Sequence, residues 1–272
     1  MILLSIITPA FNSSKWLNSC IENVACQNVG NEIEHLIIDG GSQDGSAEII
    51  QKSAAEYSHL RWLSEPDTGQ SNAMNKGLKL ARGKWIGFLN ADDFYEPGVL
   101  QSVLEIIKKN PGRHAFLIGN LNILNDFDSV ISVCKPSSMS LPRMLADICA
   151  WPYNPSSYFY PSKLHQEIGY FDEEEHFAMD YDFIFRILLA KVPVEYYNQT
   201  WGNFRMQADA KTVTDQNANL SYSRSEMLRK MYYLKSCLQV RILSRVFILF
   251  WALRNKLLGF FRKIGFLKWK YQ

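Results

Sequence analysis

The sequence predicts an α/β fold, in which a mostly parallel sheet is flanked by helices and followed by a basic, amphipathic helical tail. Short apolar runs alternate with longer amphipathic segments over the first 120 residues, as strands joined by helical crossovers do. The chain has 272 residues, 47% of them hydrophobic, which is enough for one sizeable core. Eleven Lys or Arg and no Asp or Glu lie between Met227 and Gln272, which sets the tail apart.

The strands and helices are expected in strict alternation. The predicted strands are short apolar runs bounded by turn residues, at 4–8, 34–39, 60–64, 85–90 and 114–119. The predicted helices fill the gaps between them, at 14–27, 45–57, 70–81 and 97–109. The last helix should stop at Asn110-Pro111-Gly112, because proline and glycine end helices.

Charge and cysteine usage exclude several classes of protein. Acidic residues outnumber basic ones by nine in residues 1–226, and such a body is a poor binder of nucleic acid. The five cysteines are scattered and the five histidines lack metal-ligand spacing, which favours a reduced compartment and argues against zinc. The apolar start of the chain is too short to span a bilayer and lacks a signal-peptide pattern, so we expect a cytoplasmic protein.

The most informative stretch is residues 88–97, in which an apolar strand runs into Asp92 and Asp93. In an open α/β sheet, ligands bind outside the carboxyl ends of the strands, where two carboxylates can hold a divalent metal against a diphosphate. Taken alone, the pair is also compatible with a solvated turn and a helix N-cap. Polar clusters after the other predicted strands, at 9–12, 39–46 and 65–70, favour the ligand site.

Three ordered segments, at 5–12, 38–46 and 75–93, together resemble the family 2 glycosyltransferases of the GT-A fold, a Rossmann-like architecture. The resemblance extends over residues 4–205. It implies a glycosyltransferase domain at 1–215, with a nucleotide-sugar half at 1–112 and an acceptor half at 113–215. A tail at 216–272 would follow.

By this resemblance Asp39 hydrogen-bonds the nucleotide base, and a carboxylate can indeed accept from the imide N–H of uracil. Neighbouring glycines would let the backbone come close, although they also fit a simple tight turn. The residues that the resemblance assigns to the nucleotide sugar besides Asp39 are Pro9, Phe11, Asn12, Gly41, Glu65, Asp67, Gln70, Asn90, Ala91, Asp93 and Arg205.

The metal site of the family usually reads Asp-x-Asp-Asp, whereas this chain has Asn90-Ala91-Asp92-Asp93. The resemblance implies that Asp92 binds Mn²⁺ or Mg²⁺, which suit oxygen-only sites completed by substrate phosphates. Asp93 would position Asp92 or touch the sugar. Asn90 retains an acceptor oxygen but brings no charge.

The resemblance also assigns the catalytic base, which is Asp180 at the start of a helix. Met179 replaces the usual Glu before it, and Asp182 is the competing candidate. Both aspartates also suit the first turn of a helix for electrostatic reasons alone. The acidic run at 172–175 is expected to be a solvated loop. The aromatic stretch at 151–159 would either stack on a sugar or belong to the core.

The tail mixes bulky apolar and basic residues between Leu238 and Lys270, and its longest apolar run has eight residues, too short for a bilayer. A helix of this kind can lie in the headgroup plane of an anionic membrane. The alternative is a helical pair that packs on the catalytic domain or on a second subunit. We expect a peripheral protein on the inner face of the cytoplasmic membrane.

The sequence therefore predicts a metal-dependent, inverting glycosyltransferase that moves a sugar from a nucleoside diphosphate sugar, with UDP favoured. The acceptor would be a saccharide or a lipid-linked saccharide in surface polysaccharide synthesis. Two other readings stay open: a catalytically inactive protein of this fold that binds carbohydrate or acts as a scaffold, and a sugar nucleotidyltransferase. The segment 8–13 lacks the glycine-rich basic loop that a nucleotidyltransferase normally has.

Overall fold

The structure is a computed structural model that describes residues 1–27, 30–206 and 220–263, with side chains described as far as residue 258. Strands and helices alternate in the first half as predicted. In chain order they are β1 (Leu4–Ala10), α1 (Ser14–Ala25), β2 (Ile33–Asp39), α2 (Ser46–Glu56), β3 (Leu60–Ser64), α3 (Gln70–Leu80), β4 (Trp85–Phe88) and, after a short strand, α4 (Val99–Lys109). Strand β4 ends two residues earlier than predicted, because a turn from Asn90 O to Asp93 N takes the chain out of the sheet.

The second half adds strands that return through the same sheet. Its elements are β5 (Phe94–Tyr95), β6 (Phe116–Leu124), β7 (Val130–Cys134), α5 (Leu141–Leu145), β8 (Tyr158–Pro161), α6 (Leu164–Ile168), α7 (Met179–Leu189), β9 (Val194–Arg205), α9 (Leu220–Lys235) and α10 (Leu238–Lys263). The sheet order is β3-β2-β1-β4-β8-β6-β9-β5, and β7 pairs with β6. Strands β3, β2, β1 and β4 are parallel, whereas β8 runs antiparallel to both β4 and β6.

The register brings the polar strand ends together at one edge. Ala10 at the end of β1 lies beside Asp39 at the end of β2, which in turn lies beside Ser64 at the end of β3. In β4, Phe88 pairs with Ile7, so the chain beyond Phe88 emerges at the same edge. The predicted clustering of the loops that follow the four parallel strands is thereby confirmed.

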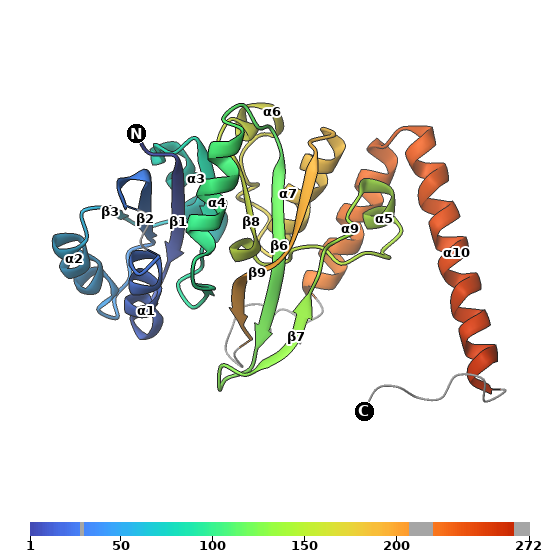
Figure 1. The fold of residues 1–272 in the computed structure, drawn as a ribbon, viewed down its shortest axis with the longest axis horizontal. Coiled ribbons are helices and arrows are strands. Elements are labelled where there is room, and N and C mark those ends of the chain that lie inside the picture. Colours follow the sequence, from blue (N-terminus) through green and yellow to red (C-terminus); the bar gives the residue numbers. More distant parts are fainter. Residues whose placement is uncertain (28–29, 207–219, 264–272) are drawn as a thin grey trace.

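Helices cover both faces of the sheet (Figure 1). Side chains alternate along each strand, so Ile6 packs with α1 and α4 on one face while Ile7 packs with α3 on the other. In β2, Ile37 and Ile38 divide in the same way. Both faces are buried, as a sheet covered by helices requires.

The two C-terminal helices differ in their contacts. Helix α9, which precedes the basic apolar segment 238–270, packs against α5 and α7. Helix α10 contacts α5 and stands at the end of the molecule away from β3 (Figure 1). In the described part of the chain, no helix is both long and apolar enough to cross a membrane. The predicted boundary at 215/216 lies outside the described residues.

Candidate active site

A cavity of about 1190 Å³ opens at the carboxyl ends of β1 and β4. Its walls come from α3 and the segment before it, from residues 147–155, from the start of α7 and from α9. Nine of the predicted site residues line it: Pro9, Phe11, Asn12, Asp67, Gln70, Asn90, Ala91, Asp92 and Asp180. Segments that are far apart in sequence therefore meet around one space large enough for a nucleotide sugar and part of an acceptor.

Asp39 lies behind this wall and is fully buried. One of its oxygens accepts from Ser42 Oγ, and the other accepts from Ser64 Oγ at 2.6 Å and from the N–H groups of Gly41 and Ser42. In this arrangement Asp39 fixes the loop after β2. Its predicted contact with the nucleotide base stays a prediction.

The same loop needs glycine at two places. Gly41 has a φ of +82°, which L-residues rarely adopt, and a Cβ on Gly40 would lie 2.5 Å from Asp67 Oδ2. The missing side chain of Gly40 leaves room for the Asp67 carboxylate to pack against the loop at the cavity wall. Glu65, in contrast, forms an ion pair with Lys76 at 2.8 Å and lies away from the cavity lining.

The carboxylate pair at the end of β4 is divided between the cavity and the interior. Asp92 lines the cavity, whereas Asp93 is buried and accepts from Asn90 Nδ2 at 2.9 Å and Asn154 Nδ2 at 2.8 Å. Burial, and next the charge of Asp92, raise the pKa of Asp93 to about 8. Asn90 also accepts from Gln70 Nε2 at 3.1 Å, so the residue that replaces the usual acid joins α3 to Asp93.

This donor set fits a divalent cation that is shared with a substrate. Among the described residues, no group of three or more His, Cys, Asp or Glu side chains forms a ready-made metal cage. Mg²⁺ and Mn²⁺ are commonly held by one or two carboxylates plus substrate phosphates and water, which is what Asp92 can offer. A cation would also relieve the repulsion between Asp92 and Asp93 that raises the pKa of Asp93.

Arg205 does not line the cavity but supports it from behind. Its guanidinium lies 4.7 Å from the ring centre of Trp16 and 4.6 Å from that of Phe94, and it donates to Asp92 O at 2.8 Å. It also forms an ion pair with Asp128 at 2.6 Å. With these partners Arg205 positions the backbone of Asp92, and its predicted contact with the nucleotide sugar stays a prediction.

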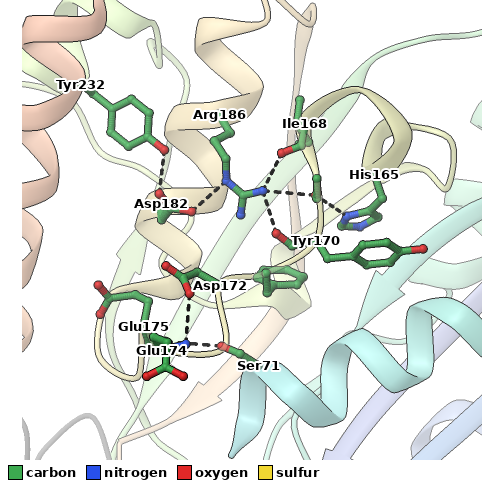
Figure 2. Close-up of polar contacts among 12 residues, drawn as sticks. Ser71, His165, Ile168, Tyr170, Asp172, Glu174, Glu175, Asp182, Arg186 and Tyr232 are labelled. Carbon is green, nitrogen blue, oxygen red and sulfur yellow. Dashed lines mark hydrogen bonds and ion pairs between the residues drawn. The ribbon is translucent and has the colours of Figure 1, made fainter.

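The two candidate bases are separated by their surroundings. Asp180 lines the cavity, and its Oδ1 accepts a hydrogen bond from Tyr158 Oη at 3.0 Å. Asp182 is buried and accepts from Arg186 Nε at 2.8 Å and Tyr232 Oη at 2.6 Å (Figure 2). Because both oxygens of Asp182 are engaged away from the cavity, only Asp180 of this pair lines it.

The far side of the cavity is aromatic. Trp151 packs on Tyr181 with ring centres 4.9 Å apart and on Tyr153 at 5.7 Å, and all three line the space. Beside them Arg229 forms an ion pair with Asp147 at 2.6 Å. Aromatic faces next to paired donors and acceptors suit a sugar ring. Within the stretch 151–159, Tyr158 and Phe159 belong to the core, while stacking of its other aromatic residues on a sugar stays a prediction.

The acidic run at 172–175 is a correction to the sequence analysis, since it is not a solvated loop throughout. Glu175 is buried and paired with Arg224, and Glu173 accepts from Asn72 and Asn75 at 2.7 and 2.8 Å. The loop is held in place because it packs between α3 and α9. Its partners on these helices are distant from it in sequence, so no local pattern predicts the contacts.

Other cavity residues were not anticipated. They are on α1, on the loop before α7 and on α9, and include Trp16, His176, Ser221, Tyr222, Ser225, Glu226 and Arg229. The α9 residues carry no motif, and only the tertiary packing of that helix brings them to the site.

Comparison with known proteins agrees with this geometry. Residues 5–120 match the family model described as glycosyl transferase family 2. The chain is 34% identical over 193 residues to an uncharacterised glycosyltransferase of Mycobacterium tuberculosis, which covers 70% of this chain and 71% of the relative. It is 25% identical over 236 residues to an uncharacterised glycosyltransferase of Rickettsia felis, covering 84% of this chain but only 38% of that longer relative.

Two solved structures share the fold. The structure of S. aureus TarS 1–349 in complex with UDP-GlcNAc has a TM-score of 0.68 at 18% identity and covers 89% of this chain and 69% of that one. A mannosyltransferase from Pyrobaculum calidifontis in complex with GDP-Man and Mn²⁺ has a TM-score of 0.60 at 15% identity, covering 97% and 81%. At these identities the likeness confirms the predicted architecture.

Proposed function

We propose a reaction for this chain, which belongs to the family 2 glycosyltransferases: it transfers a sugar from a nucleoside diphosphate sugar to a saccharide or lipid-linked acceptor. The observation that carries the proposal is that Asp92 and Asp180, 88 positions apart, line one cavity at the carboxyl edge of the sheet. Retention of both carboxylates favours an active enzyme over a scaffold. The family match favours transfer of the sugar over transfer of a nucleotide.

The two halves of the cavity suggest the places of the two substrates. We assign the donor to the side formed by Phe11, Asp67 and Asp92, and the acceptor to the aromatic side around Trp151. S. aureus TarS 1–349 has been solved in complex with UDP and with UDP-GlcNAc, which supports UDP as the nucleotide here. A bound Mn²⁺ or Mg²⁺ would stabilise charge on the departing diphosphate.

The transfer proceeds in one displacement with inversion at the anomeric carbon. The acceptor oxygen forms a bond to the anomeric carbon while the bond from that carbon to the diphosphate oxygen breaks. Asp180 takes the proton of the acceptor hydroxyl, and Tyr158 Oη holds the carboxylate toward the cavity through Oδ1. The aromatic wall orients the acceptor and excludes water.

Thermal unfolding with a panel of nucleoside diphosphates tests the donor assignment. UDP with Mn²⁺ is expected to raise the melting temperature, since a ligand at 100 times its dissociation constant adds about 2.7 kcal/mol to stability. The shift should shrink when the metal is chelated. Absence of a shift with every nucleoside diphosphate, with or without metal, contradicts the proposal.

We also propose that α10 attaches the protein to the inner face of the cytoplasmic membrane. Leu243, Val246, Phe250, Leu253 and Leu257 are spaced along one stripe of α10, and all are exposed. Basic residues accompany the stripe, and each one near an anionic leaflet contributes about 1 kcal/mol. A lipid surface fits both features.

Truncation after Ser236 is expected to release the protein from vesicles that contain anionic lipid, because it removes the whole of α10. As a milder variant, Phe250→Glu places a charge at an exposed position of the stripe and should weaken vesicle binding. Cosedimentation measures both, with neutral vesicles for comparison. The UDP-induced melting shift serves as the control for folding. Unchanged cosedimentation of both variants would mean that another surface binds the membrane.

A further inference from the structure

Side chains of helix α9 bond to the chain on both sides of Asp180, once in the loop before α7 and once within α7. Before Asp180, Arg224 of α9 pairs with Glu175, which lies five residues earlier in the chain. After it, Tyr232 of α9 donates to Asp182 (Figure 2). The first turn of α7, which carries the proposed base, is therefore held from outside by a helix that the sequence assigned to the tail.

The first contact works through the N-terminus of α7. Glu175 Oε2 accepts from Arg224 Nε at 3.0 Å and Nη2 at 2.6 Å, and Oε1 accepts from the N–H groups of Phe177 and Ala178. These N–H groups precede the first turn of the helix, where backbone donors lack intrahelical partners. Glu175 thereby joins the start of α7 to α9.

The charge on Glu175 depends on Arg224. The carboxylate is 3% exposed, and burial acts to raise its pKa, but hydrogen bonds from Arg224 and from the two N–H groups hold the pKa below its usual value. Without Arg224 the buried carboxylate would lose its ion-pair partner on α9, which is unfavourable unless the group moves or becomes protonated. Either change loosens the turn that precedes Asp180.

The second contact fixes the other side of the turn. Tyr232 is buried, its ring stacks on Phe185 with centres 4.8 Å apart, and its hydroxyl lies 2.6 Å from Asp182 Oδ1. Arg186, which pairs with Asp182 within α7, also donates to the carbonyl oxygens of Ile168 and Tyr170 outside the helix, so α7 cannot rotate about its axis without breaking these bonds.

We propose that α9 is a positioning element for the base, acting through Arg224 and Tyr232, an inference that rests on the function proposed for Asp180. The same helix supplies Tyr222, Ser225 and Arg229 to the cavity wall. The acceptor surface and the base are therefore parts of one rigid unit, and displacement of α9 would disturb in-line attack without touching the donor side. Neither Arg224 nor Tyr232 lines the cavity.

Kinetics of Arg224→Gln and Tyr232→Phe test this. We expect kcat to fall about 10- to 100-fold, the effect of a small misplacement of a reacting group, while UDP affinity stays within about twofold of wild type. Arg224→Lys keeps the positive charge beside Glu175 and should restore part of kcat. Lys108→Gln is the matched control, since Lys108 is 48% exposed on α4 and its ion-pair partner Glu32 lies away from the cavity lining.

The possible outcomes distinguish a wrong function for the protein from a wrong role for α9. A wild-type protein that binds UDP but transfers no sugar to any acceptor overturns the proposed function, and the role of α9 with it. An active wild type whose Arg224→Gln and Tyr232→Phe variants keep normal kcat overturns only the role of α9. A parallel loss of kcat and UDP affinity also overturns it, because that result means general damage to the fold.

Discussion

Replacement of Asp180 by asparagine is expected to lower kcat by about 10²- to 10⁴-fold, the usual contribution of general acid–base catalysis. The amide has the shape of the carboxylate and can still accept from Tyr158 Oη, but it cannot take a proton at neutral pH. In the proposed arrangement UDP lies on the other side of the cavity, so its affinity should be unchanged. Steady-state transfer to the acceptor and calorimetric titration with UDP measure the two quantities.

Asp172→Asn is the matched control, because Asp172 is an exposed aspartate that precedes the same helix and does not line the cavity. It should leave kcat within about twofold, as surface substitutions away from a site usually do. Near-normal turnover of Asp180→Asn with its true acceptor would assign proton removal to a different group. Asp182 is a poor substitute, since its oxygens already accept from Arg186 and Tyr232.

The first half of the fold could be predicted closely because each of its elements is encoded by a local pattern in the sequence. Each parallel strand is a short apolar run with a turn after it, and β2 and β3 end at Asp39 and Ser64, where the sequence places them. Their ends meet at one edge because right-handed crossovers return every strand in the same direction. The sequence alone could therefore predict that the polar loops lie together.

The strand order of the second half could not be predicted, because it pairs strands that are far apart in sequence. Strand β8 inserts between β4 and β6, and β9 runs beside β6 across a long separation in sequence. No local pattern encodes such neighbours. The burial of Glu175 has the same origin, since its partner Arg224 lies 49 positions away on α9.

Within the site, the residue types predicted which side chains lie near the cavity better than they predicted what each side chain does. Asp92 and Asp180 face the cavity, whereas Asp93, Asp39 and Arg205 lie behind the wall and hold it. A sequence shows that carboxylates gather, but only packing decides which of them meets a ligand. The Asn90-Ala91-Asp92-Asp93 segment illustrates this, because the atypical Asn90 links Gln70 to Asp93.

Replacement of Asp92 by asparagine is the second large effect that we expect. If Asp92 binds the cation, loss of its charge should remove the Mn²⁺ dependence of UDP binding. It should also lower kcat by about 100- to 1,000-fold, because metal stabilisation of the leaving group contributes several kcal/mol. Titration of UDP with and without Mn²⁺, followed by steady-state kinetics, measures both effects.

A second readout comes from the neighbouring carboxyl group. Burial is the main reason why the pKa of Asp93 is raised to about 8, and the charge of Asp92 is the next. Removing that charge should therefore lower the pKa of Asp93, which carbon-13 NMR of the labelled carboxyl can follow. Asp126→Asn, an exposed aspartate on the β6–β7 hairpin, is the control and should change neither quantity. Retained Mn²⁺ dependence in Asp92→Asn, together with the lowered pKa of Asp93, would show that the substitution acted electrostatically and that the cation is bound by other groups.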